Sequence, residues 1–339
     1  MNRTELKSLL TALCTAPGVS GDESGIAELA CERLKQYCPD AHLKNGCVIG
    51  TLGSSLPDAP HIMLDAHLDQ VGLIVTGITD DGFVTVGNIG GLDRRWFPAQ
   101  KVILHGKKAI PGIISTLPPH LTNGEENVMK IDQVRIDTGY PADELREILS
   151  LGDSVTFTGV TAELPGGRFT SPSLDDRAGI AVILSALDEI YQKELNCKVI
   201  VLFSTQEETG EAGAKISCFA VNPDIALAVD VSFAGDGTQG TGIPGNGAMI
   251  GISPSLSREI SNALIHTAED EKLPYQLEVM SGRTGTNADQ FSVCREGVKA
   301  CTVSFPLFYM HTPVEVVSLD DILNTGKLIS AYLRGAESC

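Results

Sequence analysis

Hydrophobic positions recur with helical spacing at the beginning of the chain. The apolar residues that would share one face of this helix are Leu6, Leu9, Leu10 and Leu13. The spacing predicts an amphipathic first helix. The helical pattern continues over residues 6–37, with a break at the turn PGVSG at residues 17–21. A short apolar run at residues 61–65 then predicts a strand.

The pattern changes between residues 70 and 168. Short segments rich in β-formers recur there, among them GLIVTGI, GFVTVGNI, KVILHG, IPGIIST and SVTFTG. Glycine, aspartate and proline turns separate these segments, and a helix-like stretch occurs around residues 141–149. This texture is typical of a small all-β barrel or sandwich. We expect it to be inserted into a larger domain, because a different pattern resumes after it.

After residue 168, helical stripes alternate with nearly continuous apolar runs. The predicted helices cover residues 175–191, 257–271 and 319–334, and the predicted strands cover residues 198–204, 225–230 and 301–305. Apolar strands that alternate with helices predict an α/β fold with a buried, mixed, largely parallel sheet flanked by helices. We therefore expect a catalytic domain at 1–69 and 169–339, with a β-rich insert at 70–168.

Composition narrows the possible partners. The 339 residues carry a net charge of −18, which argues against binding to nucleic acid or to anionic membranes. No apolar run approaches the length of a membrane span. Glu5 and Lys7 interrupt the first helix, so it does not resemble a signal peptide. The nine cysteines form no CxxC pair, as expected for a reducing cytoplasm.

Polar residues stand where the predicted strands end, or shortly after. They are His67, Asp69, Glu207, Glu208, Asp230 and His311. A further acidic pair, Asp175 and Asp176, opens the long helix. The carboxyl ends of strands in an open α/β sheet face the crevice in which ligands bind. We expect these side chains to meet in that crevice.

Imidazoles and carboxylates together suit zinc, cobalt or manganese better than calcium or copper. Five protein ligands are too many for one catalytic cation, but they suit two cations about 3.5–4 Å apart that share a carboxylate. Glu207 and Glu208 must point in different directions, so one can bind a cation while the other takes a proton from water.

Each of these residues also has a structural explanation when it is considered alone. A single histidine at a strand end is usually a hydrogen-bonding residue, Asp175 could be a helix N-cap, and Asp230 could belong to a turn. Their coincidence at several strand ends favours the metal site. No role is assigned to the histidines without such neighbours: His42, His61, His105, His120 and His266.

The order of several motifs carries a family resemblance. They are APGVSGDE, AHLDQVG, the PPHL stretch at residues 118–121, SLDDRAG, STQEETGEAGA, ALAVDVS and YMHTPVE. With them the chain resembles, over nearly its whole length, the tetrahedral aminopeptidases. These are dinuclear cytoplasmic metallopeptidases that are variously described as glutamyl aminopeptidases or endoglucanases.

The resemblance assigns roles to the metal ligands. It implies that His67 and Asp230 hold one metal ion, that Glu208 and His311 hold the other, and that Asp175 bridges the two. The donor types of these residues suit two divalent ions of zinc or cobalt, with manganese as a further option.

The resemblance also covers the catalytic residues and the insert. It implies that Glu207 is the general base and that the Asp69 carboxylate orients the His67 imidazole. It further implies that the insert is an oligomerisation domain, which helps to build hollow dodecamers in some members.

Three positions depart from the family pattern. Gln70 stands where glutamate is usual, Asn287 where aspartate is common, and Phe308 where arginine often precedes YMH. None of them is an expected metal ligand, so the departures bear on specificity and assembly.

The expected function is a dinuclear metal-dependent aminopeptidase that acts on short peptides. One alternative is a metal-dependent N-deacylase or another amidohydrolase, and another is a non-catalytic, metal-bearing assembly protein. A glycoside hydrolase is disfavoured, because adjacent residues such as Glu207 and Glu208 cannot flank a glycosidic bond.

Overall fold

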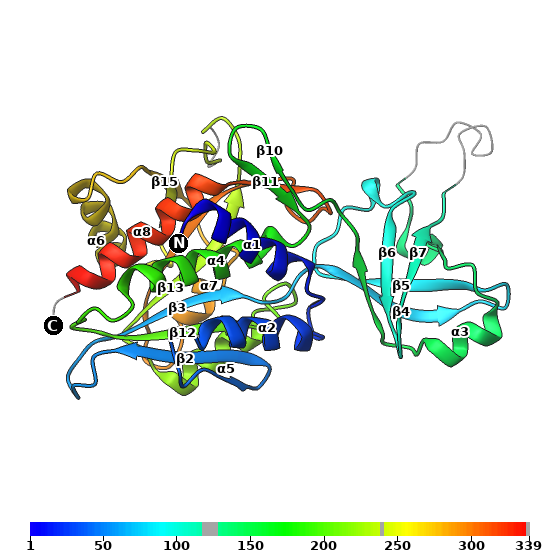
Figure 1. Ribbon diagram of the computed structural model, residues 1–339, viewed down its shortest axis with the longest axis horizontal. Coiled ribbons are helices and arrows are strands. Elements are labelled where there is room, and N and C mark those ends of the chain that lie inside the picture. Colours follow the sequence, from blue (N-terminus) through cyan, green and yellow to red (C-terminus); the bar gives the residue numbers. More distant parts are fainter. Residues whose placement is uncertain (117–127, 238–240, 337–339) are drawn as a thin grey trace.

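The computed structural model describes residues 1–116, 128–237 and 241–336. These residues form an α/β domain and a β-barrel that projects from one end of it (Figure 1). The PPHL stretch at 118–121 and the histidine it contains lie outside the described residues. An inserted β-barrel beside an α/β domain is the fold class that the sequence predicts.

The centre of the main sheet is parallel. Its inner strands, in spatial order, are β12 (Lys198–Ser204), β3 (His61–His67), β13 (Ile225–Phe233) and β16 (Lys299–Phe308). Antiparallel strands extend it on both sides: β2 (Cys47–Gly53) and β1 (His42–Lys44) beyond β12, and β17 (Glu315–Ser318), β11 (Arg168–Ser171) and β10 (Ala162–Leu164) beyond β16. β14 (Ala248–Ile252) also pairs with β16, and β15 (Tyr275–Val279) runs parallel to β14. The sheet is therefore mixed around a parallel centre.

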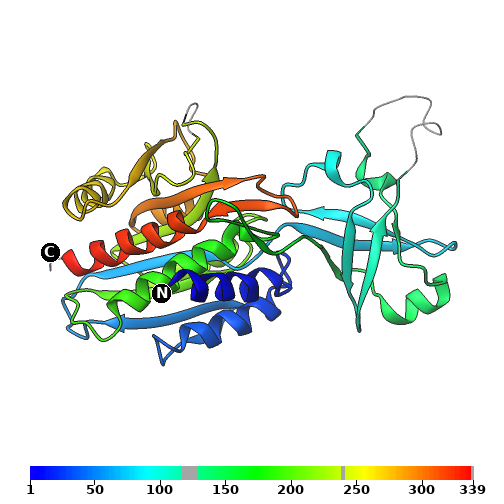
Figure 2. The same cartoon turned by 45° about the horizontal axis from the view of Figure 1, so that its top comes forward.

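Helices cover both faces of this sheet. One face packs against α1 (Arg3–Thr15), α2 (Ser24–Leu34), α4 (Leu174–Ile190), α6 (Arg258–Asp270) and α8 (Leu319–Gly335), and the other packs against α5 (Ala212–Val221) and α7 (Ala288–Ser292). Figure 2 shows α1, α4 and α8 side by side along the first face. Successive side chains of a strand point to opposite faces of the sheet, so the core has two parts. Ile62 and Leu64 of β3 face α4, whereas Met63 faces α5 and α7.

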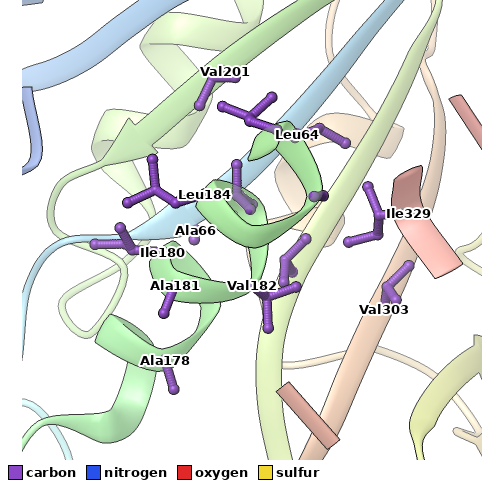
Figure 3. Close-up of a cluster of buried hydrophobic side chains, with 14 of the residues drawn as sticks. Leu64, Ala66, Ala178, Ile180, Ala181, Val182, Leu184, Val201, Val303 and Ile329 are labelled. Carbon is purple, nitrogen blue, oxygen red and sulfur yellow. The ribbon is translucent and has the colours of Figure 1, made fainter. Parts of the chain in front are cut away.

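Helix α4 is the centre of the larger core. Leu64 and Ala66 of β3, Val201 of β12, Val303 of β16 and Ile329 of α8 surround its apolar side chains (Figure 3). Its side chains from Ile180 to Ile183 are fully buried. Full burial of an isoleucine or valine side chain contributes roughly 1.5–3 kcal/mol. This packing fixes the helix, and with it the acidic residues at its first turn.

The insert is a closed barrel of antiparallel strands. Around the barrel they are β4 (Gly72–Ile78), β5 (Phe83–Ile89), β8 (Ile136–Asp137), β7 (Ala109–Ile114), β6 (Lys101–His105) and β9 (Ser154–Phe157). The short helices η1 (Arg94–Trp96), η3 (Ile131–Gln133) and α3 (Ala142–Ile148) lie between strands in the sequence. Every second residue of β7 is buried, and an aromatic group of Trp96, Phe97 and Phe157 belongs to the barrel core. The barrel thus has a core of its own.

The structure also differs from the predicted elements in places. β13 continues to Phe233, so Asp230 lies inside a strand and not at its end. The β1–β2 hairpin, α5 and the β14–β15 pair were not predicted from the sequence. The eight cysteines among the described residues are free and buried. None of the described helices combines the length and the apolar character that a membrane crossing requires.

Candidate metal centre

The parallel strands bring their polar ends to one edge of the sheet. His67 is the last residue of β3 and pairs with Ser204, the last residue of β12. Glu207 and Glu208 follow β12 in the turn that precedes α5. Asp230 pairs in register with Ser304 of β16, and His311 follows that strand after three residues.

Asp175 comes from the start of α4, on the same side as the strand ends. Asp175 and Asp176 have non-helical backbone angles, so the regular helix begins after them. The Asp176 carboxylate accepts hydrogen bonds from the backbone N–H of His67 (3.2 Å) and of Gly179 (3.0 Å). These bonds fix the beginning of α4 against the end of β3, which places Asp175 beside His67.

The expected ligands lie within a few ångströms of one another. One oxygen of Asp175, Oδ1, lies 3.0 Å from Nε2 of His67, and its other oxygen, Oδ2, lies 3.2 Å from Nε2 of His311. Oδ1 of Asp230 lies 4.0 Å from Nε2 of His67, and Oε1 of Glu208 lies 3.1 Å from Nε2 of His311. The Asp175 carboxylate therefore stands between two groups of potential ligands.

Ligand-type atoms gather here in overlapping groups. His67, Asp175 and Asp230 offer three atoms within 4.8 Å of one another, and so do Asp175, Glu208 and His311. A third group joins Glu207 to His67 and Glu208 at the same spacing. Carboxylate oxygens and imidazole nitrogens in such groups suit a borderline divalent cation. Asp175 is the residue that the first two groups share.

Asp69 contacts both the histidine and the paired glutamates. Its carboxylate accepts the backbone N–H of Glu207 (3.0 Å) and of Glu208 (3.1 Å), so it fixes the turn that carries them. Nδ1 of His67 lies 3.0 Å from the Asp69 backbone carbonyl and 3.5 Å from its carboxylate. The nearer acceptor for the His67 ring is therefore the carbonyl oxygen.

Sequence reasoning missed two groups that contact the expected ligands. The buried carboxylate of Glu315 accepts the backbone N–H of Asp175 (3.2 Å) and of His311 (2.8 Å). Nδ1 of His311 donates to the carbonyl oxygen of Gly91 (2.7 Å), which belongs to the insert. The acid in the apolar run PVEVV was a usable signal for Glu315. A backbone carbonyl leaves no signal in the sequence.

Burial sets the charge balance of the centre. Desolvation raises the pKa of Glu207 to about 9, and it also raises the pKa values of Asp230 and Glu208. Burial has the same tendency at Asp175, but hydrogen bonds from His311 and His67 outweigh it and lower the pKa of this carboxyl group. The centre thus concentrates carboxyl groups whose negative charge a cation would stabilise.

The backbone beside the centre is strained. Ser173, Gln206, Tyr309 and His311 all have φ near +60°, a region that non-glycine residues rarely adopt. Each stands within two residues of an expected ligand or base in the sequence. Such outliers are typical of functional sites, where the surrounding packing holds them in place.

The three departures from the family pattern have structural partners. Gln70 accepts hydrogen bonds from Ser173 (2.6 Å) and from the fully buried Arg177 (3.3 Å). Asn287 donates to Asp65 (2.8 Å) and Ser204 (2.9 Å) behind the strand ends. The Phe308 ring lies 5.5 Å from the guanidinium of Arg168.

A cavity of about 430 Å³ opens beside the cluster. The expected ligands and Glu207 line it, together with residues of β13, β15, β16, the 284–286 loop and two methionines, Met280 and Met310. Small-molecule sites in proteins typically have volumes of about 300–1,000 Å³, so this cavity is large enough to receive a small ligand. The remaining histidines among the described residues, which are His42, His61, His105 and His266, do not line it.

The sequence and fold match known proteins over most of their length. Residues 46–328 match the M42 glutamyl aminopeptidase family. The lysyl aminopeptidase of Pyrococcus furiosus is 32% identical over 96% of each chain. The aminopeptidase APDkam598 from the archaeon Desulfurococcus kamchatkensis has a TM-score of 0.91 and 32% identity, covering 99% of this chain and 96% of its own.

A further solved structure describes an assembly. The TET1 peptidase of Pyrococcus horikoshii, which can assemble into a tetrahedron or a large octahedral shell, has a TM-score of 0.88 and 29% identity, covering 98% of this chain and 100% of its own. The family match spans far more than half of the chain, and the full-length relatives agree with it. The chain therefore belongs to the M42 glutamyl aminopeptidase family of metal-dependent peptidases.

Proposed function

We propose that this peptidase removes N-terminal residues from short peptides with two divalent metal ions. His67 and Asp230 would hold one ion, Glu208 and His311 the other, and Asp175 would bridge them. The observation that carries the proposal is the position of the Asp175 carboxylate, whose two oxygens face two different imidazoles at 3.0 and 3.2 Å.

The residues of the centre fit such a pair of cations. The donor set consists of imidazole nitrogens and carboxylate oxygens, and all its members are buried or half-buried. Zinc and cobalt accept this mixture, and manganese is compatible with it. The backbone carbonyls at Nδ1 of His67 and of His311 would leave Nε2 of each ring free to coordinate.

When bound, the two cations would polarise the scissile carbonyl, lower the pKa of water and offer a position to the free N-terminal amine. Glu207 is the carboxyl group beside this position that is not needed as a ligand. The bound cations would oppose the effect of burial and favour the ionised form of Glu207, and this carboxylate would take a proton from the attacking water and return it to the leaving amine. Asp69 would act as a positioning residue, because its carboxylate holds the backbone of Glu207 and Glu208.

The substitution Glu207→Gln tests this assignment. It keeps the size of the side chain but removes the basic oxygen, so kcat should fall by roughly 100- to 10,000-fold. Metal content, measured by elemental analysis of the purified protein, should stay at the wild-type level. The exposed Glu163 provides the matched control, since Glu163→Gln should leave both values unchanged. Near-normal turnover in Glu207→Gln would rule out the base assignment.

We propose also that residues 70–168 form an oligomerisation domain and that the enzyme is a cytoplasmic homo-oligomer, up to the dodecamer that the family resemblance implies. The separate core of the barrel and its projection from the catalytic part, 1–69 and 169–339, support this role. Mass measurement of the purified protein in solution would test the assembly, and a monomer at micromolar concentration would contradict it.

A further inference from the structure

The family name does not fix which N-terminal side chain this enzyme prefers. The preference depends on the cavity beside the metal centre. Its lining residues other than the proposed ligands and base, here called the second wall, differ in character from those ligands. That second wall contains hydroxyl and apolar groups together with a single carboxylate. They include Ser232, Phe233, Glu278, Val279, Met280 and Thr284.

Glu278 is fixed on the same face of the sheet as Asp230. Ser232 follows Asp230 by two residues on β13, so both side chains point to one face at a spacing of about 6.6 Å. The Ser232 hydroxyl donates to Oε1 of Glu278. Ser304, which pairs with Asp230 in register, is a second hydrogen-bonding partner of Glu278 and also lines the cavity. The Glu278 carboxyl group is therefore held by Ser232 of β13 and by Ser304 of β16, close to the strand position of Asp230.

The second wall carries negative charge only. Apart from the proposed ligands and the base, Glu278 is the one charged residue among those described that line the cavity, and neither a lysine nor an arginine is among them. Glu278 is only 9% exposed. An acidic side chain in this cavity would meet a buried carboxyl group with no cationic residue to compensate it, which is unfavourable.

A basic substrate side chain would instead be favourable beside Glu278, because its positive charge would pair with the carboxylate. Lysine carries its ammonium group on a flexible four-carbon stem, and arginine presents a planar set of donors. Met280 and the half-buried Met310 offer apolar surface for such a stem. Desolvation raises the pKa of Glu278, against hydrogen bonds from Ser232 and Ser304 that lower it. A cation beside it would favour its ionised form further.

We infer that this cavity receives the N-terminal side chain of the substrate, and that Glu278 makes the enzyme select lysine or arginine there over glutamate or aspartate. The inference rests on the proposed function, because it places the substrate amine at the metal centre. It adds the substrate class and a specificity-determining residue.

The first experiment compares kcat/KM for aminoacyl-nitroanilides of lysine, arginine, leucine, alanine and glutamate with the metal-loaded full chain. Lysine and arginine should exceed glutamate by about 100-fold or more, since a charge-assisted hydrogen bond to Glu278 favours the basic substrates and an unpaired carboxylate penalises the acidic one. Binding of free lysine and free glutamate, measured by calorimetry, should show the same order without turnover.

Two substitutions test the role of Glu278. Glu278→Gln keeps a hydrogen-bond acceptor for the serines but removes the charge, so kcat/KM for lysine should fall by about 10- to 100-fold relative to leucine. Val279→Lys changes an exposed residue at the rim of the cavity and leaves the buried network intact. It should raise the glutamate-to-lysine ratio by about 10-fold or more. Glu269→Gln, an exposed carboxylate on α6, is the control and should change neither ratio.

The outcomes separate the inference from the proposed function. Cleavage of leucine and alanine substrates with no preference for lysine over glutamate would overturn the inference and leave the aminopeptidase standing. So would a lysine-to-leucine ratio that Glu278→Gln leaves unchanged. Failure to cleave any aminoacyl substrate with zinc, cobalt or manganese would instead overturn the proposed function, and the inference with it.

Discussion

Glu315 connects two parts of the metal centre that are distant in the sequence. One oxygen accepts the backbone N–H of Asp175 and the other accepts that of His311, so a single buried carboxyl group holds the backbone of two proposed ligands. Removal of one acceptor would leave a buried N–H unpaired and allow its segment to move.

Glu315→Gln should therefore weaken metal binding by roughly 10- to 100-fold, as is typical when a group that orients a ligand is lost. Titration of the metal-free variant with zinc would measure this, and kcat at saturating zinc would recover toward the wild-type value. Glu163→Gln is again the control. Unchanged zinc affinity in Glu315→Gln would show that Glu315 is not a positioning residue.

The residue scale also shows which part of the centre can be predicted from sequence. Glu207, Glu208 and His311 stand out because each follows an apolar strand closely, and the parallel arrangement of those strands brings them together. The Glu315 side chain acts by accepting backbone N–H groups, and Gly91 acts through its own backbone carbonyl oxygen. Such contacts depend on the tertiary path of the chain, which a local pattern does not contain.

At the scale of elements, His105 on the barrel strand β6 makes the stability of the folded protein depend on pH. Partial burial lowers the pKa of His105 below its ordinary 6.5, while the charge of Asp22 acts in the opposite direction. The His105 ring is hydrogen-bonded to the Thr156 hydroxyl (2.9 Å). The unfolded chain then binds a proton more readily than the folded chain. The contribution of neutral His105 to stability is fully present above pH 6.5 and is lost as the pH falls through the lowered pKa of the folded state.

His105→Gln removes this titration, so the variant should gain stability relative to the wild type as the pH falls from about 7 to 5.5. The gain should stay below about 1 kcal/mol, because the ring is partly exposed to solvent. Urea unfolding at both pH values measures it. A difference between the two proteins that does not vary with pH would contradict the assignment.

Long, regular elements were predictable from the sequence, and short or marginal ones were not. The strand at residues 198–204 and the helix at 319–334 have uninterrupted patterns, and the structure confirms them to within a residue. The ten-residue helix α5 consists mainly of small residues, and the β14–β15 pair lies near glycines and prolines. In these cases tertiary packing decides the structure more than local preference does.

At the scale of the whole molecule, the proposed cations would tie together segments from β3, α4, β13 and the chain after β12 and β16. Removal of the metal by a chelator should therefore lower Tm by several degrees, since a ligand present at a hundred times its Kd stabilises the folded state by about 2.7 kcal/mol. Asp175→Ala lacks the shared ligand, so the chelator should change its Tm much less. Equal shifts in both proteins would contradict a bridging role for Asp175.

The carbonyl of Gly91 reaches from the insert to the His311 ring, so the α/β part of the chain alone does not contain every group that contacts the proposed metal centre. An engineer who exchanged this barrel for one from a relative would have to reproduce that single oxygen atom as well as the strands. A chimera with a well-packed but slightly rotated barrel would fold and still hold His311 poorly. The junction between the two parts is therefore the place where modular redesign of this enzyme is most constrained.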